Sequence, residues 1–123
     1  MTRALLVMNE KFFSQCLRQT LEGEFKCYIE NNYKRAAITA NLCRADVVLM
    51  DMPLQSKEEL ERIYAICREI RQENPNCKLM LMCAPDAEAA SQSAINAKKN
   101  KIIDDFVYYD TSWKYLFSKL RAI

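Results

Sequence analysis

Histidine is absent from this sequence of 123 residues, and glycine occurs only once. Without histidine, the chain cannot form a serine–histidine or cysteine–histidine nucleophile pair. Zinc or haem held by histidine, and a carrier phosphorylated on histidine, are excluded on the same ground. Any acid–base chemistry must therefore come from carboxylates, lysine, tyrosine or cysteine.

The sequence also gives no signal from which we would expect a membrane-spanning or secretory segment. No apolar run approaches the roughly 18 residues that a membrane helix needs, and the apolar run Ala4–Met8 is too short for a signal peptide. Half of the residues are apolar and 28% are charged, which is a globular composition, and a net charge of +2 gives no reason to expect nucleic-acid binding. We therefore expect a single domain over residues 1–123, located in the cytoplasm and without contact to a membrane.

The six cysteines include no pair spaced C-x-x-C. Metal knuckles and thioredoxin-type redox chemistry therefore lack their signature. Because most of these cysteines accompany apolar residues, we expect them to be reduced and to pack as small hydrophobes. They are Cys16, Cys27, Cys43, Cys67, Cys77 and Cys83.

The apolar pattern alternates between strand-like runs and helical spacing. The predicted strands are Ala4–Met8, Phe25–Ile29, Val47–Met50, Leu79–Cys83 and Phe106–Tyr109. Helices are predicted to follow them from near Phe12, Tyr33, Ser56, Ala87 and Ser112. Because the strands lack strict alternation and each precedes a helix, the sequence predicts an α/β fold, a three-layer αβα sandwich around a five-stranded parallel sheet.

Several polar residues mark predicted helix ends. Ser56 followed by Glu59 is a capping-box pattern, and Ser112 and Asp86 precede two further helices as N-caps. Gly23 ends the first helix at a cap position. These local signals support the predicted alternation of strands and helices.

Ligands of open parallel sheets bind at the carboxyl ends of the strands. The candidate functional residues are therefore those that end the strands: Met8, Asn9 and Glu10 after the first, Asp51 after the third, Cys83 after the fourth, and Tyr109 with Asp110 after the fifth. We expect the Asp51 carboxylate to lie at this edge and to face residues 9, 83 and 109.

Four stretches of the chain resemble the receiver domain of bacterial response regulators. They are Leu5–Glu10, Ala45–Pro53, Lys78–Ala84 and Asp104–Asp110. The resemblance covers nearly the whole chain and implies flavodoxin-like topology. The segment Phe106–Ser112 is most similar to receivers attached to helix-turn-helix domains, so the resemblance implies a DNA-binding output domain beyond this chain and a role in transcription regulation.

The resemblance places two family positions on matching residues. Asp51 falls on the aspartate that accepts a phosphoryl group, and Phe106 falls on the aromatic residue that reports the switch. The other positions are substituted: the acid pair falls on Met8 and Asn9, the serine or threonine on Cys83, and the lysine on Tyr109.

These substitutions remove the charges that stabilise phosphoryl transfer. A thioether is a poor ligand for a hard cation, so we expect Mg²⁺ binding through Asn9 and Asp51 to be weak or absent. Glu10 lies one residue too late to replace the acid pair in register. The simpler alternatives are that Asp51 caps its loop and that the Cys83 thiol is buried and inert.

The resemblance leaves two functions open. The favoured one is a pseudo-receiver, a non-enzymatic module that keeps the fold and controls homodimerisation or a DNA-binding output. The alternative is a receiver phosphorylated on Asp51 by a sensor histidine kinase. In either case the predicted fourth helix, fifth strand and last helix would form the dimer or output face, with Tyr115 toward a partner. A flavin or small-molecule binder of flavodoxin type is disfavoured, because Met8–Phe13 contains neither glycine nor threonine.

Overall fold

The computed structural model describes residues 1–52, 56–84 and 88–123. Its five strands are β1 (Thr2–Val7), β2 (Phe25–Glu30), β3 (Val47–Asp51), β4 (Lys78–Cys83) and β5 (Asp105–Tyr108). The helices are α1 (Lys11–Leu21), the 3₁₀ helix η1 (Tyr33–Arg35), α2 (Ala36–Cys43), α3 (Lys57–Glu73), α4 (Glu88–Lys99) and α5 (Trp113–Ala122).

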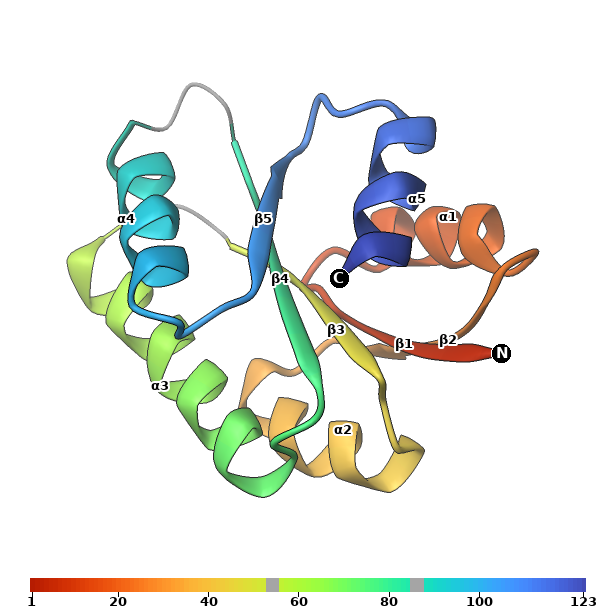
Figure 1. The fold of residues 1–123 in the computed structure, drawn as a ribbon, viewed down its shortest axis with the longest axis horizontal. Coiled ribbons are helices and arrows are strands. Elements are labelled where there is room, and N and C mark those ends of the chain that lie inside the picture. The colour runs from red at the N-terminus through yellow and green to blue at the C-terminus, as the bar shows by residue number, and fades with distance from the viewer. Residues whose placement is uncertain (53–55, 85–87) are drawn as a thin grey trace.

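All strand pairs are parallel, and the strand order is β2-β1-β3-β4-β5. Figure 1 shows α1 and α5 together on one face of the sheet, with α2, α3 and α4 on the other. The predicted three-layer αβα sandwich with flavodoxin-like topology is therefore confirmed. None of the helices in the described ranges is both long and apolar enough to cross a membrane.

The sheet is buried on both faces, which explains the continuous apolar runs in the sequence. Along β1, Leu5 and Val7 enter the core beneath α2, α3 and α4, whereas Leu6 enters the core beneath α1 and α5. Leu5 and Leu6 have no exposed surface. Complete burial of a side chain of this size contributes about 1.5–3 kcal/mol, so the central strands supply much of the stability.

Two of the predicted helix N-caps, Ser56 and Ser112, lie in the described residues and begin their helices as expected. The Ser56 hydroxyl accepts a hydrogen bond from the Glu59 amide, and the Ser112 hydroxyl accepts one from the Tyr115 amide, each at 3.2 Å. Both predicted N-caps are confirmed, whereas the predicted cap Asp86 lies outside the described residues.

Other predicted boundaries need correction. The second predicted helix begins as the 3₁₀ turn η1, and β1 begins at Thr2 and stops before Met8. Helix α1 ends at Leu21 with Glu22 as its C-cap, and Gly23 does not have a positive φ. Among the described residues, left-handed backbone occurs instead at Arg44, the C-cap of α2, with a φ of 52°, and at Lys101, just after α4, with a φ of 60°.

All six cysteines are free thiols, and four of them are buried. Desolvation raises the pKa of the Cys27 and Cys77 thiols to about 11 and that of Cys67 to about 12. Buried thiols that stay protonated are poor nucleophiles. The four buried cysteines therefore pack as small hydrophobes, as the sequence predicts.

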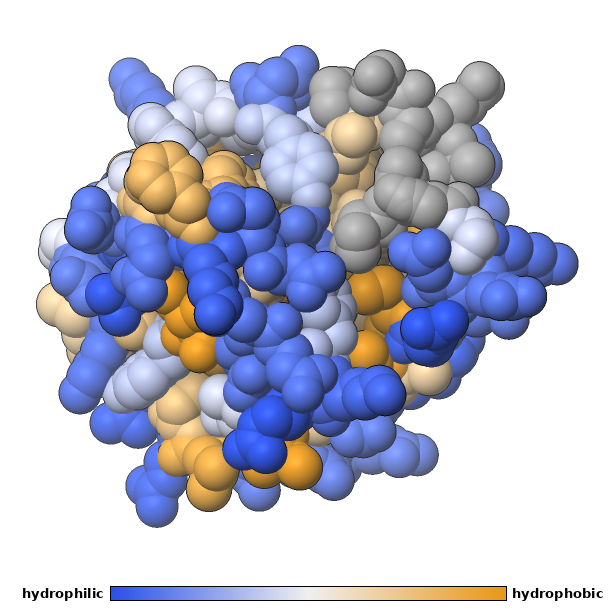
Figure 2. Space-filling model, turned by 180° about the vertical axis from the view of Figure 1, so that it is seen from behind, coloured by the Kyte–Doolittle hydropathy of each residue, from blue (hydrophilic) through white to orange (hydrophobic). Residues whose placement is uncertain are grey.

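Large hydrophobic side chains remain exposed in several places. Seen from behind, the surface is mainly hydrophilic with separate hydrophobic patches (Figure 2). Among the residues that the structure describes, the exposed large side chains are Met1, Phe12, Ile38, Leu42, Tyr109, Trp113 and Tyr115. Most of them come from α1, α2 and α5 and from the connection between β5 and α5.

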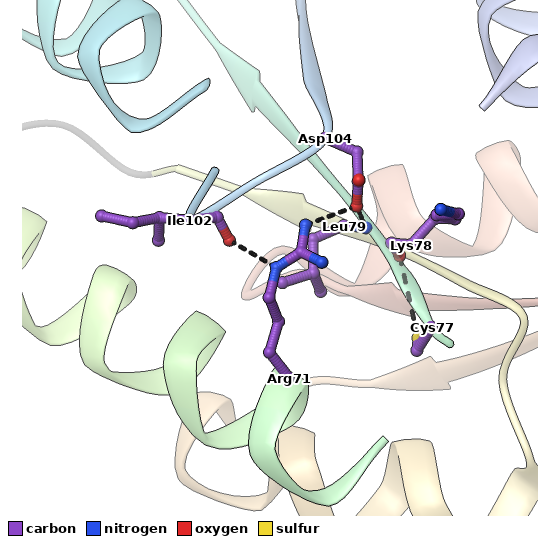
Figure 3. Close-up of polar contacts among 6 residues, drawn as sticks. All are labelled: Arg71, Cys77, Lys78, Leu79, Ile102 and Asp104. Atoms are coloured by element: carbon purple, nitrogen blue, oxygen red, sulfur yellow. Dashed lines mark hydrogen bonds and ion pairs between the residues drawn. The ribbon is translucent and has the colours of Figure 1, made fainter. Parts of the chain in front are cut away.

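A polar clamp fixes the amino end of β5 (Figure 3). The Arg71 guanidinium of α3 donates to the Asp104 carboxylate at 2.6 Å and to the Ile102 carbonyl at 3.0 Å. The same Asp104 oxygen accepts the Leu79 amide of β4 at 2.8 Å. One carboxylate therefore ties α3, β4 and the start of β5 together at the edge opposite the predicted site.

Candidate functional site

The strand register brings the predicted site residues to one edge of the sheet. Asp51 of β3 is opposite Met82 of β4, and Cys83 is opposite Tyr108 of β5. The Tyr109 amide continues this ladder by donating to the Cys83 carbonyl at 3.0 Å. The ends of these three strands are thus neighbours, as expected for the carboxyl edge of a parallel sheet.

Asp51 is a half-buried carboxylate without a charged partner in the described ranges. Its Oδ1 atom is buried and has no hydrogen-bond partner among those residues, and it takes part in no ion pair there. Desolvation raises the pKa of Asp51 to about 6. Phosphoryl transfer to a carboxylate depends on nearby positive charge, and the described surroundings of Asp51 do not supply it.

Tyr33 closes over the backbone of Asp51. Its hydroxyl donates to the Asp51 carbonyl oxygen at 2.6 Å. Burial, with the neighbouring Asp51 charge, raises the pKa of Tyr33 far above its usual range. The sequence pattern marks Tyr33 only as an apolar helix position; its place directly after β2, at the carboxyl edge, was the available signal.

The connection that carries Tyr33 is itself firmly held. The Glu30 carboxylate accepts from the Thr39 hydroxyl at 2.6 Å and from the Asn32 amide at 3.0 Å. The Asn31 side-chain amide donates to the Met8 carbonyl at 2.7 Å, which joins the end of β2 to the end of β1. Tyr33 is therefore positioned by a rigid turn rather than by a loose loop.

Asn9 and Glu10 do not form an acidic pair. Asn9 is exposed, and Glu10 is the N-cap of α1, where its carboxylate accepts the amides of Phe12 and Phe13. No group of three or more potential acidic or cysteine ligands forms a metal cluster within the described ranges. One carboxylate from Asp51 and one neutral amide from Asn9 do not fit a hard divalent cation, which prefers several charged oxygens.

Cys83 and Tyr109 direct their side chains to opposite sides of the sheet. The Cys83 thiol is fully buried in the core under α2, α3 and α4, near the Val107 carbonyl at 3.7 Å, and desolvation raises its pKa to about 11. The Tyr109 ring is 38% exposed and packs edge-on against Phe13 of α1, with ring centroids 6.1 Å apart. Neither side chain forms a hydrogen bond with Asp51 in the described residues.

The predicted switch residue Phe106 packs against Tyr108, whose hydroxyl helps to attach α4. Its ring is half-buried and meets the Tyr108 ring edge-on at 5.7 Å. The Tyr108 hydroxyl shares a hydrogen bond of 2.8 Å with Ser91 of α4, and Tyr64 of α3 shares one of 2.7 Å with Ser93. Two hydroxyl pairs therefore tie α4 to β5 and α3.

Asp105 links the elements of the predicted dimer face. Its carboxylate accepts from Lys119 of α5 at 2.8 Å and from Lys98 of α4 at 3.1 Å. Although burial acts to raise the pKa of Asp105, these lysines and the Phe106 amide hold it below its usual value. Lys119 is therefore engaged within the chain, while Tyr115 beside it is 52% exposed.

Comparisons with known proteins agree with this architecture. No family model and no curated protein matches the sequence. Among solved structures, the N-terminal domain of the nisin resistance regulator NsrR, a lantibiotic response regulator, is similar with a TM-score of 0.81 and 18% identity over 100% of this chain and 97% of that chain. The response regulator TrrA from Thermotoga maritima, in complex with Mg²⁺ and BeF, is similar with a TM-score of 0.75 and 21% identity over 99% and 98% of the two chains.

The chemotaxis protein CheY4 from Vibrio cholerae is also similar, with a TM-score of 0.76 and 14% identity over 100% of this chain and 98% of that chain. At these identities the similarity establishes the fold. The chain therefore has the CheY-like receiver-domain fold of response regulators, as the sequence resemblance predicts.

Proposed function

We propose that this chain is a pseudo-receiver: a regulatory module that keeps the receiver fold and acts through protein contacts rather than through phosphoryl transfer. The observation that carries the proposal is the isolated carboxylate of Asp51. It has no cationic partner in the described residues, and the hydroxyl of Tyr33 covers its backbone carbonyl.

The surroundings of Asp51 support this function in three ways. The Glu10 carboxylate caps α1, the Cys83 thiol is buried in the core, and Tyr109 packs on Phe13. Loss of a single electrostatic contact to a developing negative charge commonly costs about 3 kcal/mol or more in barrier height, so several losses together make transfer slow. The regulatory partner would be another protein or a DNA-binding output domain, and the module would act in the cytoplasm.

The alternative is a working receiver that takes a phosphoryl group on Asp51 from a sensor histidine kinase. In its favour, the similar protein TrrA binds Mg²⁺ and BeF, and Asp51 ends β3 at the open edge of the sheet. Against it, the described donors near Asp51 do not fit a divalent cation.

Intact mass spectrometry after incubation with acetyl phosphate and Mg²⁺ distinguishes the two functions. We predict no added phosphoryl group on this chain under conditions that phosphorylate TrrA, the positive control. If the wild-type chain gains one phosphoryl mass and the Asp51→Asn variant does not, Asp51 is a working acceptor and the pseudo-receiver proposal is wrong.

A further inference from the structure

A groove of about 450 Å³ opens between the turn after β2 and helix α3. Asn31, Asn32 and Tyr33 line one side, and residues of α3 line the other. The volume lies within the range of small-molecule sites, which is roughly 300–1,000 Å³.

The interior of the groove is apolar. Ile63 is only 4% exposed, and Ile66 is half-buried one turn further along α3. The Tyr33 ring faces them from the opposite side, with its hydroxyl already engaged by the Asp51 carbonyl. An apolar body that packs against these three side chains would remove hydrophobic surface from water.

The rim of the groove is cationic. Lys34 and Arg62 are both exposed at its border, and within the parts of the chain that the structure describes neither forms an ion pair. Glu59 is the acidic residue of the lining, and its backbone amide is bound by the Ser56 cap. Because the lining carries two cations and one carboxylate, its net charge is positive, and a single anionic group would complement it.

The rim is also preorganised. The Asn31 side chain is bound to the Met8 carbonyl, and the Asn32 side chain accepts the Lys34 amide at 3.1 Å. Because the turn is already ordered, binding would not have to fix it at the cost of conformational entropy.

We propose that this groove binds a small amphipathic carboxylate, with its apolar body on Ile63, Ile66 and the Tyr33 ring and its carboxylate between Lys34 and Arg62. The site does not depend on whether Asp51 accepts a phosphoryl group. It reaches the sheet edge through Tyr33, which both lines the groove and holds the Asp51 carbonyl.

The test is a titration of the isotope-labelled chain, followed by amide chemical shifts, with naphthoate, neutral naphthamide and cationic naphthylmethylammonium. We predict saturable shifts from naphthoate that cluster at residues 31–34 and 59–66, and an affinity at least about fivefold higher than for the other two probes, since a charge-assisted contact is lost in both. Scattered shifts, no saturation, or equal affinity for the three probes would overturn the proposal.

Two variants and one control assign the contacts. Arg62→Gln should remove the preference for naphthoate over naphthamide, and Ile66→Gln should weaken all three probes. Arg68→Gln, an exposed arginine of α3 outside the lining, should bind like the wild type. If Arg68→Gln loses the preference as Arg62→Gln does, or if Ile66→Gln binds like the wild type, the groove is not the site.

Discussion

At the scale of single residues, the proposed function depends on Asp51 and the side chains around it. The buried apolar run that precedes Asp51 is enough to place this residue at the carboxyl edge of the sheet. The hydroxyl of Tyr33 on the Asp51 carbonyl was not predictable in this way, because this contact depends on the exact path of a turn. The Glu10 cap of α1 is a local contact, and it agrees with the simpler interpretation that Asn9 and Glu10 only start the first helix. The directions of the Cys83 and Tyr109 side chains determine where these residues pack. The two residues are neighbours in the ladder, but their side chains lie on opposite sides of the sheet.

The raised pKa of Asp51 predicts a pH-dependent stability. With a folded pKa of about 6 against an ordinary value of 3.8, the native state holds the proton more tightly than the unfolded state. The stability that this group contributes is therefore fully present below the unfolded pKa and is lost as the pH rises through about 6.

The variant Asp51→Asn should remove the free-energy cost of holding an ionised carboxylate in this partly buried position. We expect it to raise the free energy of unfolding by about 1–2 kcal/mol near pH 7, after allowance for the partial exposure of the group, and to give no gain at about pH 3.5. Urea unfolding at the two pH values measures the difference. An equal gain at both, or a loss near pH 7, would show that the ionised carboxylate is not destabilising.

At the scale of elements, the strands and helices were predictable wherever the signal was local. The caps Ser56 and Ser112 act within one helical turn, so their sequence pattern is sufficient. The start of the second helix was predicted less well, because η1 is set by contacts of Glu30 and Tyr33 with other elements. The attachment of α4 was not predictable either, since its serines bond to tyrosines from elsewhere in the chain.

Helix α4 is held by polar ties more than by large apolar side chains. Its buried apolar positions in the described part are Ala94 and Ala97, which offer little surface. The hydrogen bonds of Ser91 with Tyr108 and of Ser93 with Tyr64 therefore carry a large share of its attachment. Each such bond contributes about 1 kcal/mol.

The double variant Tyr64→Phe with Tyr108→Phe should loosen α4 selectively. We expect faster amide hydrogen exchange in α4 and unchanged exchange in α1 on the other face of the sheet. Tyr28→Phe, a half-buried tyrosine whose hydroxyl has no bond among the described residues, is the matched control. Uniform acceleration in both helices, or no change in α4, would contradict the role given to the two hydroxyl pairs.

At the scale of the whole molecule, the sheet order and layers were predictable because strand-like apolar runs alternate with helically spaced apolar residues along the whole chain. Strands buried on both faces give continuous apolar runs, and each is followed by a helix-spaced segment, which restricts the topology strongly. The binding surface was less predictable, since residues that contact a partner form a weaker pattern in the sequence than residues of the core do. Tyr115 and Trp113 at the start of α5 remain exposed, while Lys119 is already paired with Asp105.

An interaction module that works without phosphoryl transfer should assemble without it. We expect a reversible dimer through the surface of α4, β5 and α5, because Trp113 and Tyr115 leave apolar area exposed there. Tyr115→Ala should weaken this dimer, whereas Leu42→Ala, an exposed apolar change on α2, should leave it intact.

The pseudo-receiver proposal is tested most directly by sedimentation velocity of the wild-type chain, before and after treatment with acetyl phosphate and Mg²⁺. A pseudo-receiver should show the same monomer–dimer equilibrium in both samples, with dimers weakened only in Tyr115→Ala. A chain that is monomeric until treated, and whose Asp51→Asn variant stays monomeric afterwards, would contradict it.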